Sequence, residues 1–257
     1  MTPGSRRRAR SSASRTGART PRVDPQPGPA VPWSPERDRP GIVSFVLAAL
    51  LAMYGVPVWS PRRPPTDELV LTILSQHTSD LNAERAFDTL AARLPSWDLV
   101  AEAPVDEVAT AIASGGLARQ KAPRIQAALR AIRQARADYD LGFLGAMPPL
   151  TARDWLTALP GIGPKTASVV LLFCFGLPLM PVDTHVHRVT LRIGLFPPGT
   201  SADRAHDLAL AIFPADRMFE GHVTLITHGR RTCHARRPAC GRCAVAPRCR
   251  YLDPSAP

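Results

Sequence analysis

Lysine is scarce in this sequence of 257 residues. Only Lys121 and Lys165 are lysines, and the other thirty basic residues are arginines. A guanidinium stays protonated at neutral pH and is no nucleophile, whereas a lysine amine can become one. Each lysine is therefore a candidate for chemistry that arginine cannot perform. Chance survival in an arginine-rich composition would account for at least one of them.

The sequence also lacks an uninterrupted apolar run long enough to cross a membrane. Its most apolar segment, residues 42–59, is broken by Ser44, Gly55 and Pro57, which favours a buried helix. That segment lies about 30 residues beyond the arginine run at 6–8, too far for the apolar part of a signal peptide. We expect a cytoplasmic protein, nucleoid-associated in a bacterium, with no membrane partner.

Alternation of apolar and polar residues, which is typical of a half-buried strand, is missing as well. Helical spacing recurs instead, and Pro or Gly closes most segments. A chain of this length with 45% apolar residues can bury a sizeable core. The sequence predicts an all-α globular protein. We expect helices over residues 41–52, 66–75, 82–94, 104–113, 122–139, 151–159, 167–175, 201–213 and 221–232.

Positive charge is concentrated in two segments. The net charge is +11, with nine Arg and three acidic residues in 1–40 and seven Arg and no acidic residue in 228–250. Such a distribution indicates a polyanionic partner, either nucleic acid or an anionic surface. Residues 1–40 also contain eight Pro and few large apolar residues, which predicts a disordered tail. The tail either raises non-specific DNA affinity or is only a solvated terminus.

Four of the five cysteines fall within 17 residues: Cys233, Cys240, Cys243 and Cys249. This clustering is not that of a distributed disulfide framework. Four thiolates so close together repel one another unless a cation neutralises them, which indicates a metal site. Zinc ligands usually come in pairs two to four residues apart, and only one of the three gaps fits, so an iron–sulfur cluster is favoured. Cys174, in an apolar helix, is predicted to be a core residue.

Residues 159–167, Leu-Pro-Gly-Ile-Gly-Pro-Lys-Thr-Ala, predict a tight turn between two helices. Gly161 and Gly163 permit positive φ and let a ligand approach the backbone. The free N–H groups at the start of the second helix would suit a phosphate, and Ile162 would anchor the hairpin in the core. A Gly-x-Gly turn alone is weak evidence, but Lys165 at its end favours a functional role.

Residues 159–167 and 182–189 resemble segments of the endonuclease III family of DNA glycosylases, and this resemblance singles out Lys165 and Asp183. A lysine and an aspartate together would suffice for removing a base from DNA. Breaking an N-glycosidic bond places positive charge on the sugar, which a carboxylate such as Asp183 can stabilise. An amine such as Lys165 that attacks C1′ forms an imine, which acidifies the C2′ proton and permits β-elimination of the 3′ phosphate. Asp183 follows Pro181 and also fits the N-cap of a helix; the two roles are compatible.

Several of these segments resemble the endonuclease III family of DNA glycosylases. Residues 159–167 are similar to its helix-hairpin-helix, and 182–189, Val-Asp-Thr-His-Val-His-Arg-Val, to its segment with the catalytic aspartate. The cysteine spacing matches its [4Fe–4S] signature. The resemblance covers about residues 40–252. It implies Lys165 as the catalytic amine, Asp183 as the catalytic carboxylate, and a [4Fe–4S] cluster on the four clustered cysteines.

The resemblance further implies a bilobal helix-hairpin-helix glycosylase fold. Residues 66–178 would form a helical barrel that contains the hairpin. Residues 41–65 and 179–252 would form the second lobe, with the cluster loop at 233–249. A monomer would bind double-stranded DNA with a damaged base or an abasic site in the cleft between the lobes. The base would leave the stack to reach the catalytic residues.

Contacts with DNA are also implied by the resemblance. Residues 73–80, Ile-Leu-Ser-Gln-His-Thr-Ser-Asp, resemble the family's groove segment, in which a glutamine fills the gap left by the flipped nucleotide. Here either Gln76 or His77 would be the filler, unless the segment is only a polar turn. Lys121 is predicted to contact a phosphate. Further predicted DNA contacts are Gly161, Ile162, Gly163, Thr166, His185, Arg188, Arg236 and Arg237. Histidines predicted to be structural are His187, His206, His222 and His234.

We therefore expect a bifunctional glycosylase that excises oxidised or otherwise damaged pyrimidines and cleaves the abasic site through a Lys165 Schiff base. One alternative is a related glycosylase for uracil or mismatched thymine. A second is a non-catalytic DNA-binding iron–sulfur protein, against which the Lys165 and Asp183 pair argues.

Overall fold

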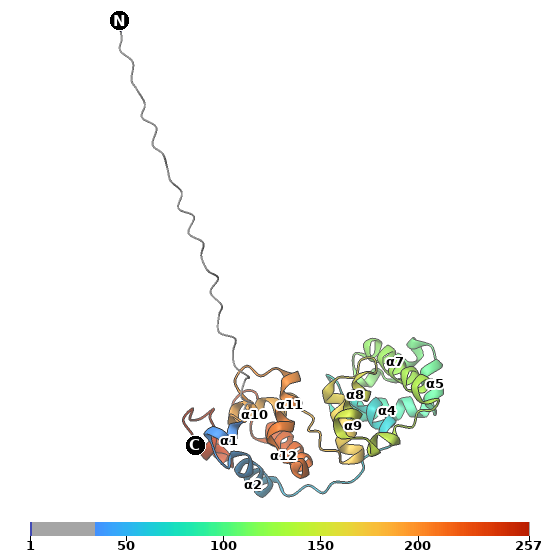
Figure 1. Ribbon diagram of the computed structural model, residues 1–257. Coiled ribbons are helices and arrows are strands. Elements are labelled where there is room, and N and C mark those ends of the chain that lie inside the picture. Colours follow the sequence, from blue (N-terminus) through green and yellow to red (C-terminus); the bar gives the residue numbers. More distant parts are fainter. Residues whose placement is uncertain (2–33, 257) are drawn as a thin grey trace. The chain divides into compact units, whose positions relative to one another are not determined.

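The computed structural model describes Met1 and residues 34–256, and within these residues it is helical without strands (Figure 1). Most of the expected disordered tail, residues 2–33, lies outside the described residues. Its last part differs from the expectation, because Pro35–Asp38 form helix α1. Arg39 is buried, and its Nη1 donates to the carbonyl of Ile193 at 2.7 Å. The ordered chain thus begins before residue 40.

The α-helices are α1 Pro35–Asp38, α2 Ile42–Tyr54, α3 Pro65–Leu74, α4 Asp80–Arg93, α5 Trp97–Glu102, α6 Val105–Ala111, α7 Ala118–Arg136, α8 Pro149–Thr157, α9 Pro164–Phe175, α10 Thr184–Ile193, α11 Ala202–Ile212 and α12 Met218–Arg231. Short 3₁₀ turns lie at Ala113–Gly115, Gly142–Ala146, Ala215–Arg217, Cys240–Arg242 and Ala246–Arg248. All nine expected helices are present, with shifted ends.

Two helices were not expected, and one differs in where it begins. Helices α1 and α5 are short, and α10 follows the predicted N-cap at Asp183. Helix α7 starts at Ala118, four residues before the predicted start, so Pro123 lies inside its N-terminal part. Proline at this sixth position removes the N–H that would bond to the carbonyl four residues earlier, so α7 tolerates one missing helical hydrogen bond.

Two hydrophobic cores hold these helices together. Helices α3 to α9 enclose the first, which includes Leu74, Ile125 and Leu171. Helices α2 and α10 to α12 enclose the second. Helix α9 belongs to both, since Leu171 faces the first core and the adjacent Leu172 and Phe173 face the second. The helix that carries Lys165 therefore joins the two cores.

Within the described residues, no helix combines the length and the apolar character that a bilayer crossing requires.

Candidate active site

The predicted hairpin connects α8 to α9. Gly161 has φ +76°, a conformation that favours glycine, whereas Gly163 has φ −96° and does not show the expected positive value. Gly163 is the N-cap of α9, and a Cβ there would meet open space. Ile162 is buried in the first core, as predicted. The Thr166 side chain is also buried, so only its backbone N–H remains for an anion.

Lys165 is the second residue of α9, directly after Pro164. Proline suits this first position because its missing N–H would have no partner there. The Lys165 side chain is half-buried and lines a cavity of about 590 Å³. Helix α9 therefore presents this lysine to an open volume.

Asp183 is the N-cap of α10 and lines the same cavity. Its Oδ1 accepts hydrogen bonds from the backbone N–H groups of His185 at 2.9 Å and Val186 at 2.7 Å. This confirms the predicted capping role. None of the described residues donates a hydrogen bond to Oδ2. One oxygen holds the helix while the other is available to the cavity.

His222 on α12 is a cavity residue that the sequence analysis assigned only a structural role. Its Nδ1 donates to the carbonyl of Pro181 at 2.9 Å, since a carbonyl can only accept. Burial lowers the pKa of His222 to about 4, against the opposing effect of Asp183. The ring is therefore neutral at pH 7. Nothing in its local sequence marks it, because Asp183 lies on another segment and only folding brings the two together.

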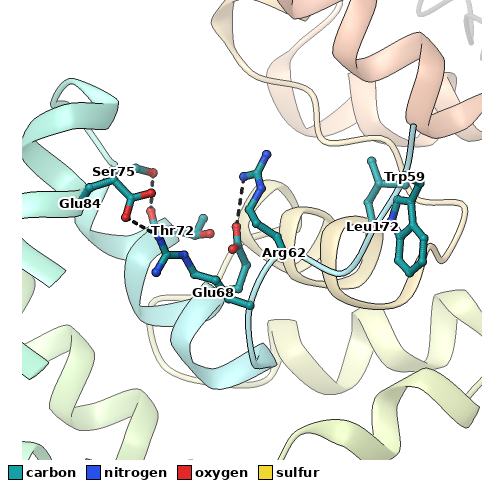
Figure 2. Close-up of polar contacts among 8 residues, drawn as sticks. Trp59, Arg62, Glu68, Thr72, Ser75, Glu84 and Leu172 are labelled. Atoms are coloured by element: carbon teal, nitrogen blue, oxygen red, sulfur yellow. Dashed lines mark hydrogen bonds and ion pairs between the residues drawn. The ribbon is translucent and has the colours of Figure 1, made fainter. Parts of the chain in front are cut away.

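Arg62 and Arg63, in the segment before α3, line another side of the cavity. Figure 2 shows the polar contacts of this segment. Trp59 fixes this segment by donating its indole N–H to the carbonyl of Leu172 at 2.8 Å. The guanidinium of Arg62 lies 3.5 Å from Oε1 of Glu68 and 3.9 Å above the Phe173 ring. Arg62 and Glu68 were not predicted, because only the fold shows that they line the same cavity as Lys165.

Lys121 does not have the predicted role of a phosphate contact. Its side chain is buried, and its ammonium donates to the carbonyls of Leu74 at 2.6 Å and Gly115 at 2.8 Å. These carbonyls end helix α3 and the 3₁₀ turn Ala113–Gly115 that follows α6, and a buried ammonium satisfies both. Burial lowers the pKa of Lys121. The residue therefore ties helix ends together inside the first core.

The candidate gap-filling residues lie in the turn between α3 and α4. Gln76 is half-buried, whereas His77 is exposed and has φ +55°. Ser75 and Asp80, at the two ends of this turn, line the cavity. The turn therefore borders the cavity and projects His77 into solvent.

The Arg188 side chain donates hydrogen bonds to backbone carbonyls of the fold. Its Nε donates to the carbonyl of Cys233 at 3.1 Å and its Nη2 to that of Gly229 at 2.9 Å. Nη2 also lies 3.2 Å from Nδ1 of His185, which must accept. No described hydrogen bond joins Arg188 to the Asp183 carboxylate. The arginine fastens α10 to the end of α12, while its exposed Nη1 has only a 3.5 Å contact with the carbonyl of Thr184, so its contact with a DNA phosphate stays a prediction.

The remaining histidines of the prediction have structural partners or lie at the surface. His206 is buried and its Nε2 accepts from the N–H of Val182 at 3.2 Å. His187 contacts the carbonyl of Thr200 at 2.8 Å. His234 is exposed. Cys174 is buried, and burial raises the pKa of its thiol to about 12, as expected of a core cysteine.

The four clustered cysteines line one small cavity at the C-terminal end of the chain, Cys233, Cys240, Cys243 and Cys249. Burial raises the pKa of Cys243, and the neighbouring thiols raise it further. The described residues contain no group of three His, Cys, Asp or Glu side chains placed to hold a single metal ion. A tetrahedral zinc would need sulfurs at about 2.3 Å from one point. Four thiols at one cavity are a donor set of the kind that holds zinc or an iron–sulfur cluster.

The loop that carries these cysteines is fixed from α10. Arg192 donates to the carbonyls of His234 at 2.7 Å and Ala235 at 2.9 Å. The N–H of Ala239 closes the loop by donating to the carbonyl of Thr232 at 2.9 Å. Arg236 and Arg237 remain exposed at its tip, where phosphates can reach them.

Comparison with known proteins gives one consistent family. The profile of the HhH-GPD superfamily of base excision DNA repair proteins matches residues 70–214. Endonuclease III of Sulfolobus acidocaldarius is 35% identical over 185 residues, which are 71% of this chain and 80% of the relative. Endonuclease III of Escherichia coli is 35% identical over 189 residues, 74% of this chain and 85% of the relative.

Solved structures agree with this relationship. A trapped endonuclease III–DNA covalent intermediate superposes with a TM-score of 0.71 at 28% identity, covering 82% of this chain and 95% of that one. A thermostable thymine-DNA glycosylase shares the fold, with a TM-score of 0.69 at 21% identity over 85% of this chain and 98% of that one. The chain belongs to the endonuclease III family of the HhH-GPD superfamily.

Proposed function

We propose that this protein excises damaged pyrimidines from double-stranded DNA and cleaves the abasic site, with Lys165 as the nucleophile and Asp183 as its carboxylate partner. Family membership makes the chain a DNA glycosylase and abasic-site lyase of base excision repair. One observation carries the assignment of residues. Lys165 on α9 and Asp183 at the start of α10 line the same cavity of about 590 Å³.

The cavity has room for a nucleotide that has left the DNA stack. The amine of Lys165 forms a bond to C1′ as the glycosidic bond breaks, and the base leaves with the bonding electron pair and then takes up a proton. Asp183 stabilises the positive charge on the sugar through Oδ2. The amine nitrogen then loses a proton and the C1′–O4′ bond breaks, so that the sugar ring opens, O4′ takes up a proton and a protonated imine forms between C1′ and the nitrogen. Removal of a C2′ proton then expels the 3′ phosphate, which cuts the strand.

His222 supports Asp183 without sharing its charge. The hydrogen bond from its Nδ1 fixes the carbonyl of Pro181, two residues before the catalytic carboxylate. Because burial lowers the pKa of His222 to about 4, the ring adds no positive charge beside Asp183 at pH 7. We therefore assign His222 as a positioning residue.

DNA affinity comes from groups outside the cavity. The exposed Arg236 and Arg237 and the free N–H groups at the start of α9 face anionic ligands. The exposed His77 is the better placed of the two candidate gap-filling residues, since Gln76 is half-buried. Phosphate contacts of this kind make binding weaken as salt increases.

The cysteine loop is proposed to hold a [4Fe–4S] cluster on Cys233, Cys240, Cys243 and Cys249. The four thiols surround one cavity and include no bonded disulfide. A bound cluster would neutralise the thiolates and fix the loop that presents Arg236 and Arg237. It has no step in base excision.

Borohydride trapping tests this assignment. Wild-type protein should form a covalent adduct with duplexes that carry an abasic site or thymine glycol, and Lys165→Ala should form none while still binding DNA. Lys121→Met, assayed at a temperature at which circular dichroism shows it to be folded, is the matched control, because it removes the only other lysine and should leave trapping intact. An adduct that persists in Lys165→Ala would assign the nucleophile elsewhere. A duplex with uracil, included beside the others, identifies the preferred base.

A further inference from the structure

Glu68 is the most deeply buried acidic side chain of the cavity wall. It lies on α3 and is 1% exposed. Oε1 faces Arg62 at 3.5 Å, whereas Oε2 has no hydrogen-bond partner among the described residues. Among the described residues with such a buried, unpartnered side-chain atom, Glu68 is the one that lines the cavity. A buried carboxylate oxygen without a partner is costly, so a ligand that supplies the missing donor would be favoured.

Glu68 belongs to the same enclosure as the reacting groups. The guanidinium of Arg62 bridges from Glu68 to the Phe173 ring, 3.9 Å below it. The Phe173 ring contacts the His222 ring edge to face, with centroids 5.5 Å apart. The charge of Asp183 raises the pKa of His222 and that of Lys165 lowers it, so both groups lie near this ring. A continuous wall therefore leads from the reacting groups to the unpartnered carboxylate oxygen.

We propose that Glu68 determines base specificity by accepting a hydrogen bond from an N–H of the flipped pyrimidine, while Arg62 donates to the acceptor beside it on the ring. This inference rests on the proposed glycosylase function. Pyrimidines carry such adjacent pairs on their Watson–Crick edge, either N3–H beside a carbonyl or an exocyclic amine beside N3. The Arg62 and Glu68 pair offers the complementary donor and acceptor.

Arg62 can yield to an incoming base. Its side chain is half exposed, and a single contact of 3.5 Å joins it to Glu68. Partly exposed ion pairs of this kind contribute little stability. Burial raises the pKa of the Glu68 carboxyl, and Arg62 and Arg63 oppose this effect. A base N–H at Oε2 would favour the ionised form further.

Comparing base excision with abasic-site cleavage distinguishes a residue that recognises the base from one that only supports the cavity wall. Base excision requires the base to be held, whereas cleavage of a preformed abasic site involves no base. A residue that only supports Arg62 or the cavity wall would affect both reactions. A residue that recognises the base affects excision alone.

The experiment compares single-turnover base excision with abasic-site cleavage for Glu68→Met and Glu68→Gln. Methionine keeps the volume of the side chain but cannot accept the bond, so excision should fall at least about tenfold. Glutamine keeps an acceptor without the charge and should show a smaller loss. Abasic-site cleavage should stay within about twofold in both variants. Glu107→Gln, on the exposed surface of α6, is the control.

Parallel reactions on thymine glycol and 5-hydroxycytosine distinguish N3–H from an exocyclic amine as the donor, because the base that supplies it suffers the larger loss. Unchanged excision in Glu68→Met, or equal losses of excision and abasic-site cleavage, would overturn the role of Glu68. If Glu68→Met melts well below wild type, the test rests on Glu68→Gln, for which the loss of base excision is compared with the loss of abasic-site cleavage. Wild-type protein that cleaves no abasic duplex would instead refute the proposed function.

Discussion

Oδ1 of Asp183 accepts the backbone N–H of Val186 at 2.7 Å. The proposed catalytic carboxylate is therefore also the N-cap of α10. The positive end of a helix favours a negative charge at this place. The two hydrogen bonds to Oδ1 fix the direction of the carboxylate, so folding itself orients Oδ2 for the substrate.

Asp183→Asn separates these two roles. The amide oxygen can still cap the helix, but the negative charge is lost, so base excision should fall about 100-fold or more with little change in melting temperature. Asp183→Ala should lose activity as well and also about 1 kcal/mol of stability. Single-turnover kinetics and chemical unfolding measure both. Asparagine at wild-type activity would show that Asp183 is only a cap.

Lys121→Met tests the finding that this lysine is structural. The carbonyls of Leu74 and Gly115 would lose their donor inside the core, so we expect stability to fall by roughly 2–4 kcal/mol. The salt dependence of DNA affinity should not change. Arg236→Ala provides the comparison, because loss of one phosphate contact should reduce the slope of log affinity against log salt by about 0.9. If Lys121→Met also reduced this slope, the result would show that Lys121 contacts a DNA phosphate.

Stability should decrease in mild acid through His222. Its pKa is about 4 in the folded protein and 6.5 without the fold. As the pH falls from 6.5 to 4, the unfolded chain takes up a proton that the folded chain does not bind, which costs up to roughly 3 kcal/mol. His222→Asn retains an N–H for Pro181 and does not titrate, so its unfolding free energy should fall less between pH 7.5 and 5. Equal falls in both proteins would contradict this account.

The cysteine loop makes a prediction that visible absorbance can check. Protein purified without oxygen should be brown, and Cys243→Ala should lose the colour and bind DNA more weakly, because the loop with Arg236 is no longer fixed. Cys174→Ala is the matched control, since Cys174 lies in the first core and should leave the colour intact. A colourless wild-type protein that contains stoichiometric zinc would refute the cluster.

The local sequence was sufficient for features that depend on nearby residues. Glycine at Gly161 provides the positive φ of the hairpin turn, and Asp183 after Pro181 marked the start of α10 through its capping side chain. Apolar residues at helical spacing predicted an all-α chain. The four cysteines, close together in sequence, line one cavity because a short loop cannot carry them far apart.

Tertiary structure decided what distant segments do to one another. The sequence around Lys121 predicted a phosphate contact, but in the fold α7 packs so that the ammonium is buried against the carbonyls of Leu74 and Gly115. Arg62, Glu68 and His222 carried no local signal, yet the fold places all three around Lys165. Residue type and spacing record local backbone preferences and burial patterns. Solvent exclusion and the partners of a polar atom arise only when separate helices pack, so the chemistry of the cavity wall was decided there.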